Sequence, residues 1–247
     1  MIHGIIFDLG STLMYLDDEW KDIDARSTLA LVEFLHANGV PVGDNFVEAF
    51  RAARSHGWEL AEETNVEHTL GQALTQALSG LGYSSLDGLI PRAVEQYFAL
   101  AEIHWTCYPG ALDTLHALKE RGLRVGVISN ADDDGLVQRT SVRLGFSRFA
   151  DPVISSAGFS YRKPDPRIFE HVARIWSLPP EEIAMVGDAP RYDIIGAHRA
   201  GMKAILIDHG ENAWWQSVPA ELANEPGIQS DAVVHSLLEI PTVLGRL

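Results

Sequence analysis

Short apolar runs alternate with helix-like stripes over most of the chain. The runs are apolar at consecutive positions, which is typical of strands buried on both faces of a parallel sheet. They span residues 2–7, 123–128, 152–154, 183–186 and 203–207, with a possible edge strand at 232–235. Between them, apolar residues recur every three or four positions, as in residues 168–176, which indicates helices. The pattern predicts an α/β fold with a doubly wound, Rossmann-like parallel sheet.

One long segment breaks this alternation. From residue 15 to residue 100 the apolar positions keep a helical spacing, and glycine-bearing turns separate the stripes. The spacing predicts about four amphipathic helices in succession. We therefore expect an all-helical module, residues 15–100, inserted into an α/β core domain formed by residues 1–14 and 101–247.

Composition and charge exclude several classes of protein. Hydrophobic residues make up 46% of the 247 residues, enough for a substantial core. The formal net charge of −15 opposes binding to nucleic acid, whose phosphate backbone attracts clustered Lys and Arg. No apolar run is long enough to span a bilayer, and no signal peptide is visible before the first strand. The single cysteine, Cys107, excludes an intrachain disulfide, so we expect a cytoplasmic protein.

Several predicted strands end in residues that carry chemistry. Open α/β sheets bind their ligands at the carboxyl ends of the strands, so these residues are expected to lie close together. A further motif, which contains a lysine, lies in the loop region before the strand over residues 183–186. In chain order, the four motifs contain Asp8, Ser129-Asn130, Lys163-Pro164 and Gly187-Asp188.

These four motifs, in this order and with a helical insertion after the first, resemble those of the haloacid dehalogenase-like hydrolase superfamily. The resemblance covers nearly the whole chain. It implies that residues 15–100 form a cap domain over a Rossmann-like core, and that the protein hydrolyses small phosphorylated metabolites with Mg²⁺. Partners other than this substrate are not expected, neither nucleic acid nor membrane, and the sequence does not determine the oligomeric state.

The resemblance also assigns a role to each motif. Asp8 would be the nucleophile that attacks phosphorus and forms an aspartyl-phosphate, which splits one difficult step into two. A carboxylate repels a phosphate dianion, so positive charge would come from Lys163 and from Mg²⁺, which prefers oxygen ligands. The implied metal ligands are Asp8, the carbonyl of Gly10, Asp188 and, through water, Asp193. The implied phosphate-binding residues are Thr12, Ser129, Asn130 and Lys163, of which Ser129 and Lys163 are also counted as catalytic.

The first motif departs from the family pattern at one position. Most phosphatases of this family carry a second aspartate two residues after the nucleophile, where this chain has Gly10. That aspartate protonates the leaving group and then activates water. Glycine keeps the backbone carbonyl, so we expect metal binding to persist and acid–base catalysis to weaken. A lost general acid is worth roughly 10²–10⁴-fold in rate.

Three functions are compatible with this departure. In the first alternative, the protein is a phosphatase that uses another proton donor, such as Asp17, Asp18 or Glu19, or that acts on a substrate whose leaving group needs little help. Alternatively it is similar to the 2-haloacid dehalogenases, which lack that aspartate but work without metal, whereas Asp188 and Asp193 keep the metal-site pattern. A non-catalytic binding or regulatory protein is the third alternative, against which the joint presence of Asp8, Lys163 and Asp188 argues.

Specificity is expected to come from the helical module. Residues 15–20, together with His56, Trp58 and His68, are candidates to line the substrate cleft, although Trp58 is expected mainly in the core of the module. Arg162 and Arg191 flank the motifs, but we assign them no substrate role. Three further acids, Asp132, Asp133 and Asp134, are interpreted as capping and first-turn residues of a helix.

Overall fold

The computed structural model describes residues 1–84, 86, 88–210, 218 and 222–247. Its main element is a six-stranded sheet in the order β5-β4-β1-β6-β7-β8, in which every neighbouring pair is parallel. The strands are β1 (Gly4–Phe7), β4 (Arg124–Ser129), β5 (Val153–Ser155), β6 (Ile183–Gly187), β7 (Lys203–Ile207) and β8 (Ala232–Val234). This arrangement confirms the predicted doubly wound α/β fold.

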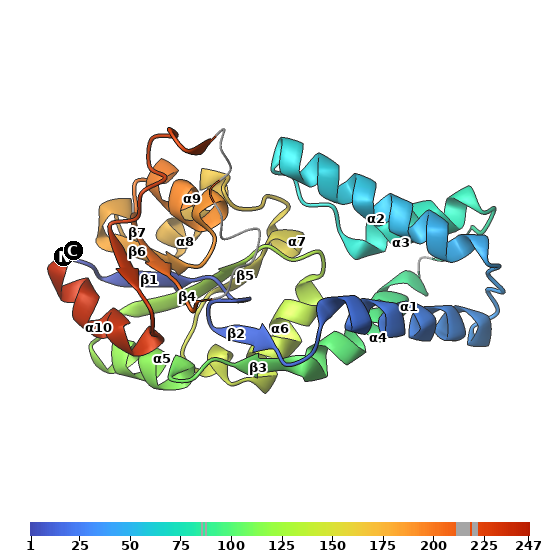
Figure 1. The fold of residues 1–247 in the computed structure, drawn as a ribbon, viewed down its shortest axis with the longest axis horizontal. Helices are drawn as coiled ribbons and strands as arrows, with labels where there is room; N and C mark the ends of the chain where they lie inside the picture. Colours follow the sequence, from blue (N-terminus) through green and yellow to red (C-terminus); the bar gives the residue numbers. More distant parts are fainter. Residues whose placement is uncertain (85, 87, 211–217, 219–221) are drawn as a thin grey trace.

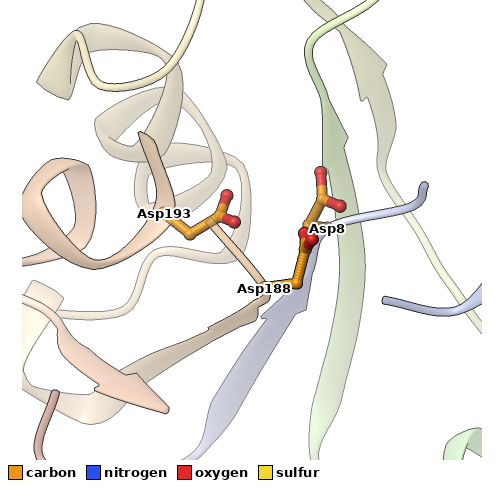
Figure 2. Close-up of side chains that lie close together, drawn as sticks. All are labelled: Asp8, Asp188 and Asp193. Atoms are coloured by element: carbon orange, nitrogen blue, oxygen red, sulfur yellow. The ribbon is translucent and has the colours of Figure 1, made fainter. Parts of the chain in front are cut away.

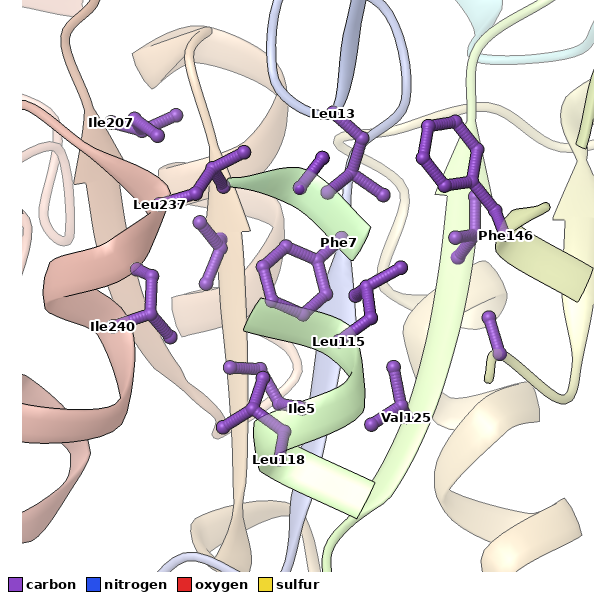
Figure 3. Close-up of a cluster of buried hydrophobic side chains, with 14 of the residues drawn as sticks. Ile5, Phe7, Leu13, Leu115, Leu118, Val125, Phe146, Ile207, Leu237 and Ile240 are labelled. Atoms are coloured by element: carbon purple, nitrogen blue, oxygen red, sulfur yellow. The ribbon is translucent and has the colours of Figure 1, made fainter. Parts of the chain in front are cut away.

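Helices cover both faces of this sheet, as Figure 1 shows, with α5 and α10 on one side and α8 and α9 on the other. Side chains alternate along β1, so Ile5 and Phe7 pack against one helical layer and Ile6 against the other. Figure 3 shows the first of these clusters. The helices of the core are α5 (Ala111–Glu120), α6 (Asp134–Arg143), α7 (Ser156–Phe159), α8 (Pro166–Trp176), α9 (Ile195–Arg199) and α10 (Ile240–Val243).

Four long helices follow the first strand and form a separate group (Figure 1). They are α1 (Trp20–Ala37), α2 (Asn45–Thr64), α3 (Leu70–Gly80) and α4 (Ile90–His104). α1 packs along α4, and α2 packs along α3. Their apolar faces enclose a hydrophobic cluster of their own, which includes Leu31, Phe46, Phe50, Leu74 and Phe98. The predicted helical segment is therefore present, and its treatment as a domain with limits at residues 15 and 100 stays a prediction.

A short antiparallel ribbon connects this helical module to the core. It consists of β2 (Met14–Leu16) and β3 (Trp105–Cys107), paired so that Leu16 lies opposite Trp105. The sequence did not predict these strands, because three residues are too few to show an alternating pattern. The ribbon brings the two ends of the module side by side at the edge of the core. Within the part of the chain that the structure describes, no helix is both long and apolar enough to cross a membrane.

Candidate active site

The central strand of the sheet ends in Asp8, and its two neighbours end close to the other motifs. β1 pairs with β4 on one side and with β6 on the other, so Asp8 lies between Ser129-Asn130 and Gly187-Asp188. The backbone N–H of Asp8 continues the ladder by donating to the carbonyl of Val186 over 2.8 Å. The sheet order thus gathers residues that are far apart in the sequence at one edge, as predicted.

Lys163 is the cation of this site, and it is buried. Its Nζ lies 2.5 Å from Oδ1 of Asp8 and 2.7 Å from Oδ1 of Asp193. It also donates to the carbonyl of Ile128 at the end of β4 over 3.0 Å. Burial by itself would lower the pKa of Lys163, but the nearby Asp193 and Asp8 carboxylates outweigh it and raise the pKa above its usual value. Lys163 is therefore charged throughout the physiological range.

Two of the three buried carboxyl groups at the site contact this lysine, and the third, Asp188, lies beside them. Ligand oxygens of Asp8, Asp188 and Asp193 all lie within 4.8 Å of one another. Figure 2 shows Asp193 directed toward the other two from the segment after β6. Burial raises the pKa of Asp193 to about 6, and the charge of Lys163 opposes this rise. The site thus concentrates more negative charge than its one lysine neutralises.

Asp193 can approach this closely because residue 187 is a glycine. A Cβ atom on Gly187 would lie 2.2 Å from Cγ of Asp193, far inside van der Waals contact. The Asp193 carboxylate is also held by the backbone N–H of Ala189, which donates to Oδ2 over 3.0 Å. Asp193 lies in a π-helical turn, Pro190–Ile194, directly after β6.

The charges and ligand atoms of this cluster fit a hard divalent cation. With Asp8, Asp188 and Asp193 ionised, three negative charges face one lysine, so a divalent ion would restore neutrality. All three offer carboxylate oxygens, the ligands that Mg²⁺ prefers. Gly10, the fourth implied ligand, lines the same cleft as these residues.

The remaining motif residues support the site in different ways. The Asn130 side chain accepts from the backbone N–H of Lys163 over 2.8 Å and donates to its carbonyl over 2.9 Å, which fixes the lysine segment beside β4. Thr12 is fully buried, and its hydroxyl lies 3.5 Å from Oδ1 of Asp188. Ser129 is buried at the end of β4. Asn130 lines the cleft, whereas Thr12 and Ser129 are not among its described lining residues.

The site opens into a cleft of about 1090 Å³ between the core and the helical module. The predicted segment 15–20 contributes every one of its residues to the lining, and Trp58 of α2 faces the cleft as well. The expectation that Trp58 is mainly a core residue is wrong, since 46% of its surface is exposed. An adjoining cavity of about 640 Å³ contains His68, whereas His56 lines neither space. α2 turns His56 away because residues two positions apart face different sides of a helix.

Two glutamates of the helical module, which sequence reasoning did not identify, contact the core beside the site. Glu62 accepts from Arg191 over 2.6 Å and lies 3.5 Å from Arg162. Glu67 accepts from the hydroxyl of Ser156 over 2.5 Å, and its carboxylate lies 3.8 Å from Nε of Arg162. The two arginines that flank the motifs therefore pair with the module. No local pattern in the sequence predicts these ion pairs, because the paired residues are about a hundred residues or more apart in the chain.

Comparison with known proteins agrees with this geometry. The chain is 41% identical over 101 residues to glyceraldehyde 3-phosphate phosphatase of Methanothermobacter thermautotrophicus, a match to 41% of the chain and 44% of that protein, less than half of its length. The enzyme of that name from Methanopyrus kandleri is 28% identical over 85% of the chain and 86% of its own length.

Among solved structures, a 2-haloacid dehalogenase from Pseudomonas syringae pv. Tomato superposes on the chain with a TM-score of 0.70 at 26% sequence identity. The match covers 100% of this chain and 99% of the dehalogenase chain. The family model described as haloacid dehalogenase-like hydrolase matches residues 2–201. These residues hold all four motifs and the helical module. The chain is therefore a member of the haloacid dehalogenase-like hydrolase family.

Proposed function

We propose that the protein is a Mg²⁺-dependent phosphatase that hydrolyses small phosphate monoesters through an aspartyl-phosphate on Asp8. The observation that carries the proposal is the joint placement of Asp8, Asp188 and Asp193 around Lys163. A phosphate dianion would be repelled by the three carboxylates alone. Lys163 and a divalent cation together would supply the positive charge that allows the Asp8 carboxylate to approach and attack phosphorus.

Each residue has a distinct part in this proposal. Asp8 lines the cleft and would attack phosphorus, and its ion pair with Lys163 holds the carboxylate in place. Asp188, Asp193 and the carbonyl of Gly10 would hold the metal with Asp8. When bound, the metal would offset the charge of the phosphoryl group. Thr12 would orient Asp188 through its hydroxyl.

Phosphate contacts would come from the end of β4. Ser129, the backbone N–H of Asn130 and Lys163 lie at the strand end next to Asp8, where phosphoryl oxygens would be held. Two relatives bear the name of a phosphatase of glyceraldehyde 3-phosphate, a small phosphorylated metabolite, which supports the same substrate class. A cytoplasmic location stays a prediction.

The test is phosphate release from a panel of small esters, with and without Mg²⁺, by the wild-type chain and by Asp8→Asn. We expect Mg²⁺-dependent turnover that EDTA and Asp8→Asn both abolish. Asp113→Asn serves as the control, since Asp113 is an exposed residue of α5 that lies outside the lining of the cleft. Absence of turnover on every ester by a folded protein would refute the proposal.

The second candidate is a 2-haloacid dehalogenase, in which Asp8 would attack carbon. Two observations favour it: Gly10 in place of the usual aspartate, and the similarity to the Pseudomonas syringae dehalogenase. Against it stands the carboxylate triad, which suits a metal that this chemistry does not use. Halide release from 2-haloacids that persists in EDTA would support the dehalogenase instead.

A further inference from the structure

Aromatic side chains line much of the cleft that holds Asp8. They come from β2, from the start of α1, from α2, from β3 and from the turn after β6, and are Tyr15, Trp20, Trp58, Trp105 and Tyr192. Trp20 and Trp58 are 42% and 46% exposed, although large apolar surfaces usually pack inside a protein. A phosphoryl group fills little of a cleft of about 1090 Å³, so these rings are available to the rest of a substrate.

One of the rings borders Gly10, the position at which most phosphatases of the family carry the acid. A Cβ atom on Gly10 would lie 3.6 Å from Cη2 and 4.0 Å from Cζ3 of Trp105. The ribbon holds the ring there, because Trp105 pairs with Leu16 in β2 and Gly10 bridges to Met14 of the same strand. An indole edge thus flanks the place where the leaving group departs.

Two of the acids at the rim of the cleft, Asp17 and Asp18, are engaged with other groups. Asp17 forms an ion pair with His104 at 2.7 Å. The N–H of Glu19 and the guanidinium of Arg26 lower the pKa of Asp18, so Asp18 is ionised at neutral pH and has no proton to donate. The hydroxyl of Tyr192 donates to Glu62 over 2.9 Å. A leaving group that departs without a proton suits such a site.

The acidity of the leaving group decides how much a missing proton donor matters. A phenol has a pKa of about 10, as tyrosine does, whereas an aliphatic alcohol is about as weak an acid as water, with a pKa of about 15.7. An aryl oxide can therefore leave as the anion, while an alkoxide depends on protonation. Aromatic rings also favour offset or edge contacts with one another, which the lining of the cleft offers.

We propose that the substrate is an aryl phosphate, a monoester whose leaving group is an aromatic alcohol; this inference rests on the proposed phosphatase function. A carboxylate oxygen of Asp8 bonds to phosphorus while the bond from phosphorus to the aryl oxygen breaks. The electron pair leaves on the aryl oxygen, which takes a proton from solvent water, and the hydroxide so formed takes up the proton that the attacking water releases in the next step. Water then attacks the phosphorus, the bond to Asp8 breaks, and inorganic phosphate leaves with Asp8 restored. The products are the phenol and phosphate.

Three esters distinguish the effect of an aromatic ring on binding from the effect of the acidity of the leaving group on turnover. They are phenyl phosphate, 2-phenylethyl phosphate and ethyl phosphate. We expect kcat/KM for phenyl phosphate to exceed that for ethyl phosphate by at least about a hundredfold, because only the alkoxide needs the missing acid. 2-Phenylethyl phosphate should share the low KM of phenyl phosphate and the low kcat of ethyl phosphate. Glyceraldehyde 3-phosphate, which has no ring, serves as a second aliphatic substrate.

Binding of the ring is measured separately with phosphonates that cannot be hydrolysed. Phenylphosphonate should inhibit more tightly than methylphosphonate, and Trp58→Ala should weaken only the former, by roughly tenfold. Leu29→Ala is the matched control, an exposed apolar residue of α1 that lies outside both cavities. Trp105→Phe should retain most of the affinity, because Nε1 of Trp105 has no hydrogen-bond partner among the described residues.

Gly10→Asp tests the leaving-group argument directly. Its Cβ fits at ordinary contact distance from Trp105, and the new carboxyl should raise ethyl phosphate turnover far more than phenyl phosphate turnover. Turnover of ethyl phosphate or glyceraldehyde 3-phosphate as efficient as that of phenyl phosphate would overturn the aryl assignment while leaving the phosphatase function intact. Equal inhibition by the two phosphonates would overturn it too. Hydrolysis of no ester at all would refute both.

Discussion

Glu62 of α2 and Tyr192 of the turn after β6 are joined by hydrogen bonds between the helical module and the core. The Tyr192 hydroxyl lies 3.0 Å from one carboxylate oxygen of Glu62 and 2.9 Å from the other. Burial, together with the Glu62 charge, raises the pKa of Tyr192 to about 12, so the hydroxyl keeps its proton and remains a donor. Tyr192 directly precedes Asp193, and the contact therefore links the helical module to the carboxylate cluster.

Glu62→Ala is expected to destabilise the protein by about 1–3 kcal/mol, because Arg191 and Tyr192 lose their acceptor in a partly buried place. The measurement is urea denaturation followed by circular dichroism. Glu63→Ala is the control, since Glu63 is the next residue of the same helix and is exposed. Equal stabilities of the two variants would show that the contact contributes nothing.

Removal of the buried lysine should be the most harmful single change at the site. Lys163→Met keeps the length of the side chain but leaves Asp8 and Asp193 without their cation, at an expected cost of about 3–5 kcal/mol. Mg²⁺ should recover part of this loss, since it offsets the same charges. Melting temperatures with and without Mg²⁺ measure both effects. A melting temperature of Lys163→Met that matches the wild type in metal-free buffer would contradict the prediction.

Metal binding should depend on pH in a defined direction. Burial raises the pKa of Asp193 above its usual value, so as the pH falls a proton competes with the cation for its carboxylate. We expect Mg²⁺ to raise the melting temperature at about pH 8 and to have much less effect at about pH 5. Asp188→Asn should lose the response at both values. An equal response of this variant and the wild type would place the metal elsewhere.

Gly187→Ala should disrupt the site without touching a ligand, because the new methyl group would overlap the Asp193 carboxylate. We expect Mg²⁺ affinity to fall by at least about tenfold, as is usual when groups that position a ligand are altered. Gly80→Ala is the matched control: nothing lies within 4 Å of its Cβ position at the end of α3, so that variant should be neutral or slightly stabilised. Isothermal titration calorimetry with Mg²⁺ compares the two variants, and unchanged affinity in Gly187→Ala would contradict the argument.

Asp132 should make the protein less stable as pH rises. Burial raises its pKa to about 6, and the opposing charge of Arg54 only reduces the rise. Between the unfolded value of 3.8 and about 6, the folded state binds more protons than the unfolded state, so stability falls with pH and is lowest above about 6. Asp132→Asn should therefore be more stable than the wild type by about 1–3 kcal/mol at about pH 8.

At about pH 5 the Asp132→Asn difference should be roughly half as large, and it should disappear only below the unfolded pKa of 3.8, where the aspartate is protonated in both states. Denaturant titrations at the two pH values provide the comparison. Asp133→Asn does not serve as a control, because Asp133 caps α6 by accepting from the N–H of Leu136. A constant difference between wild type and Asp132→Asn at both pH values would contradict the assignment.

The sheet and the carboxylate cluster could be predicted because their signals are local. Each buried strand is a continuous apolar run, and Asp8 and Asp188 follow such runs directly. Parallel topology then requires that their ends meet at one edge. Asp133 was also expected as a helix cap, and its side chain does accept from the N–H of Leu136 at the start of α6.

What could not be predicted depends on packing between distant segments. The ribbon of β2 and β3 has too few residues for a pattern, yet it sets Trp105 beside Gly10. Glu62 and Glu67 look like ordinary surface acids of a helix and its following loop until the fold places arginines opposite them. Trp58 carried an ambiguous signal, since an aromatic residue on an amphipathic helix suits either a core or a cleft.

The ribbon also bears on how quickly the core can assemble. β1 and β4 are neighbours in the sheet although the entire helical module separates them in the sequence, and closing so long a loop in a disordered chain costs conformational entropy. Contacts among α1 to α4 are local by comparison and can form early. Once the helices have packed, β2 and β3 are brought close enough to pair. The conformational search by which β1 finds its neighbours in the sheet is then short. Early assembly of the module is thus expected to speed the pairing of β1 with β4.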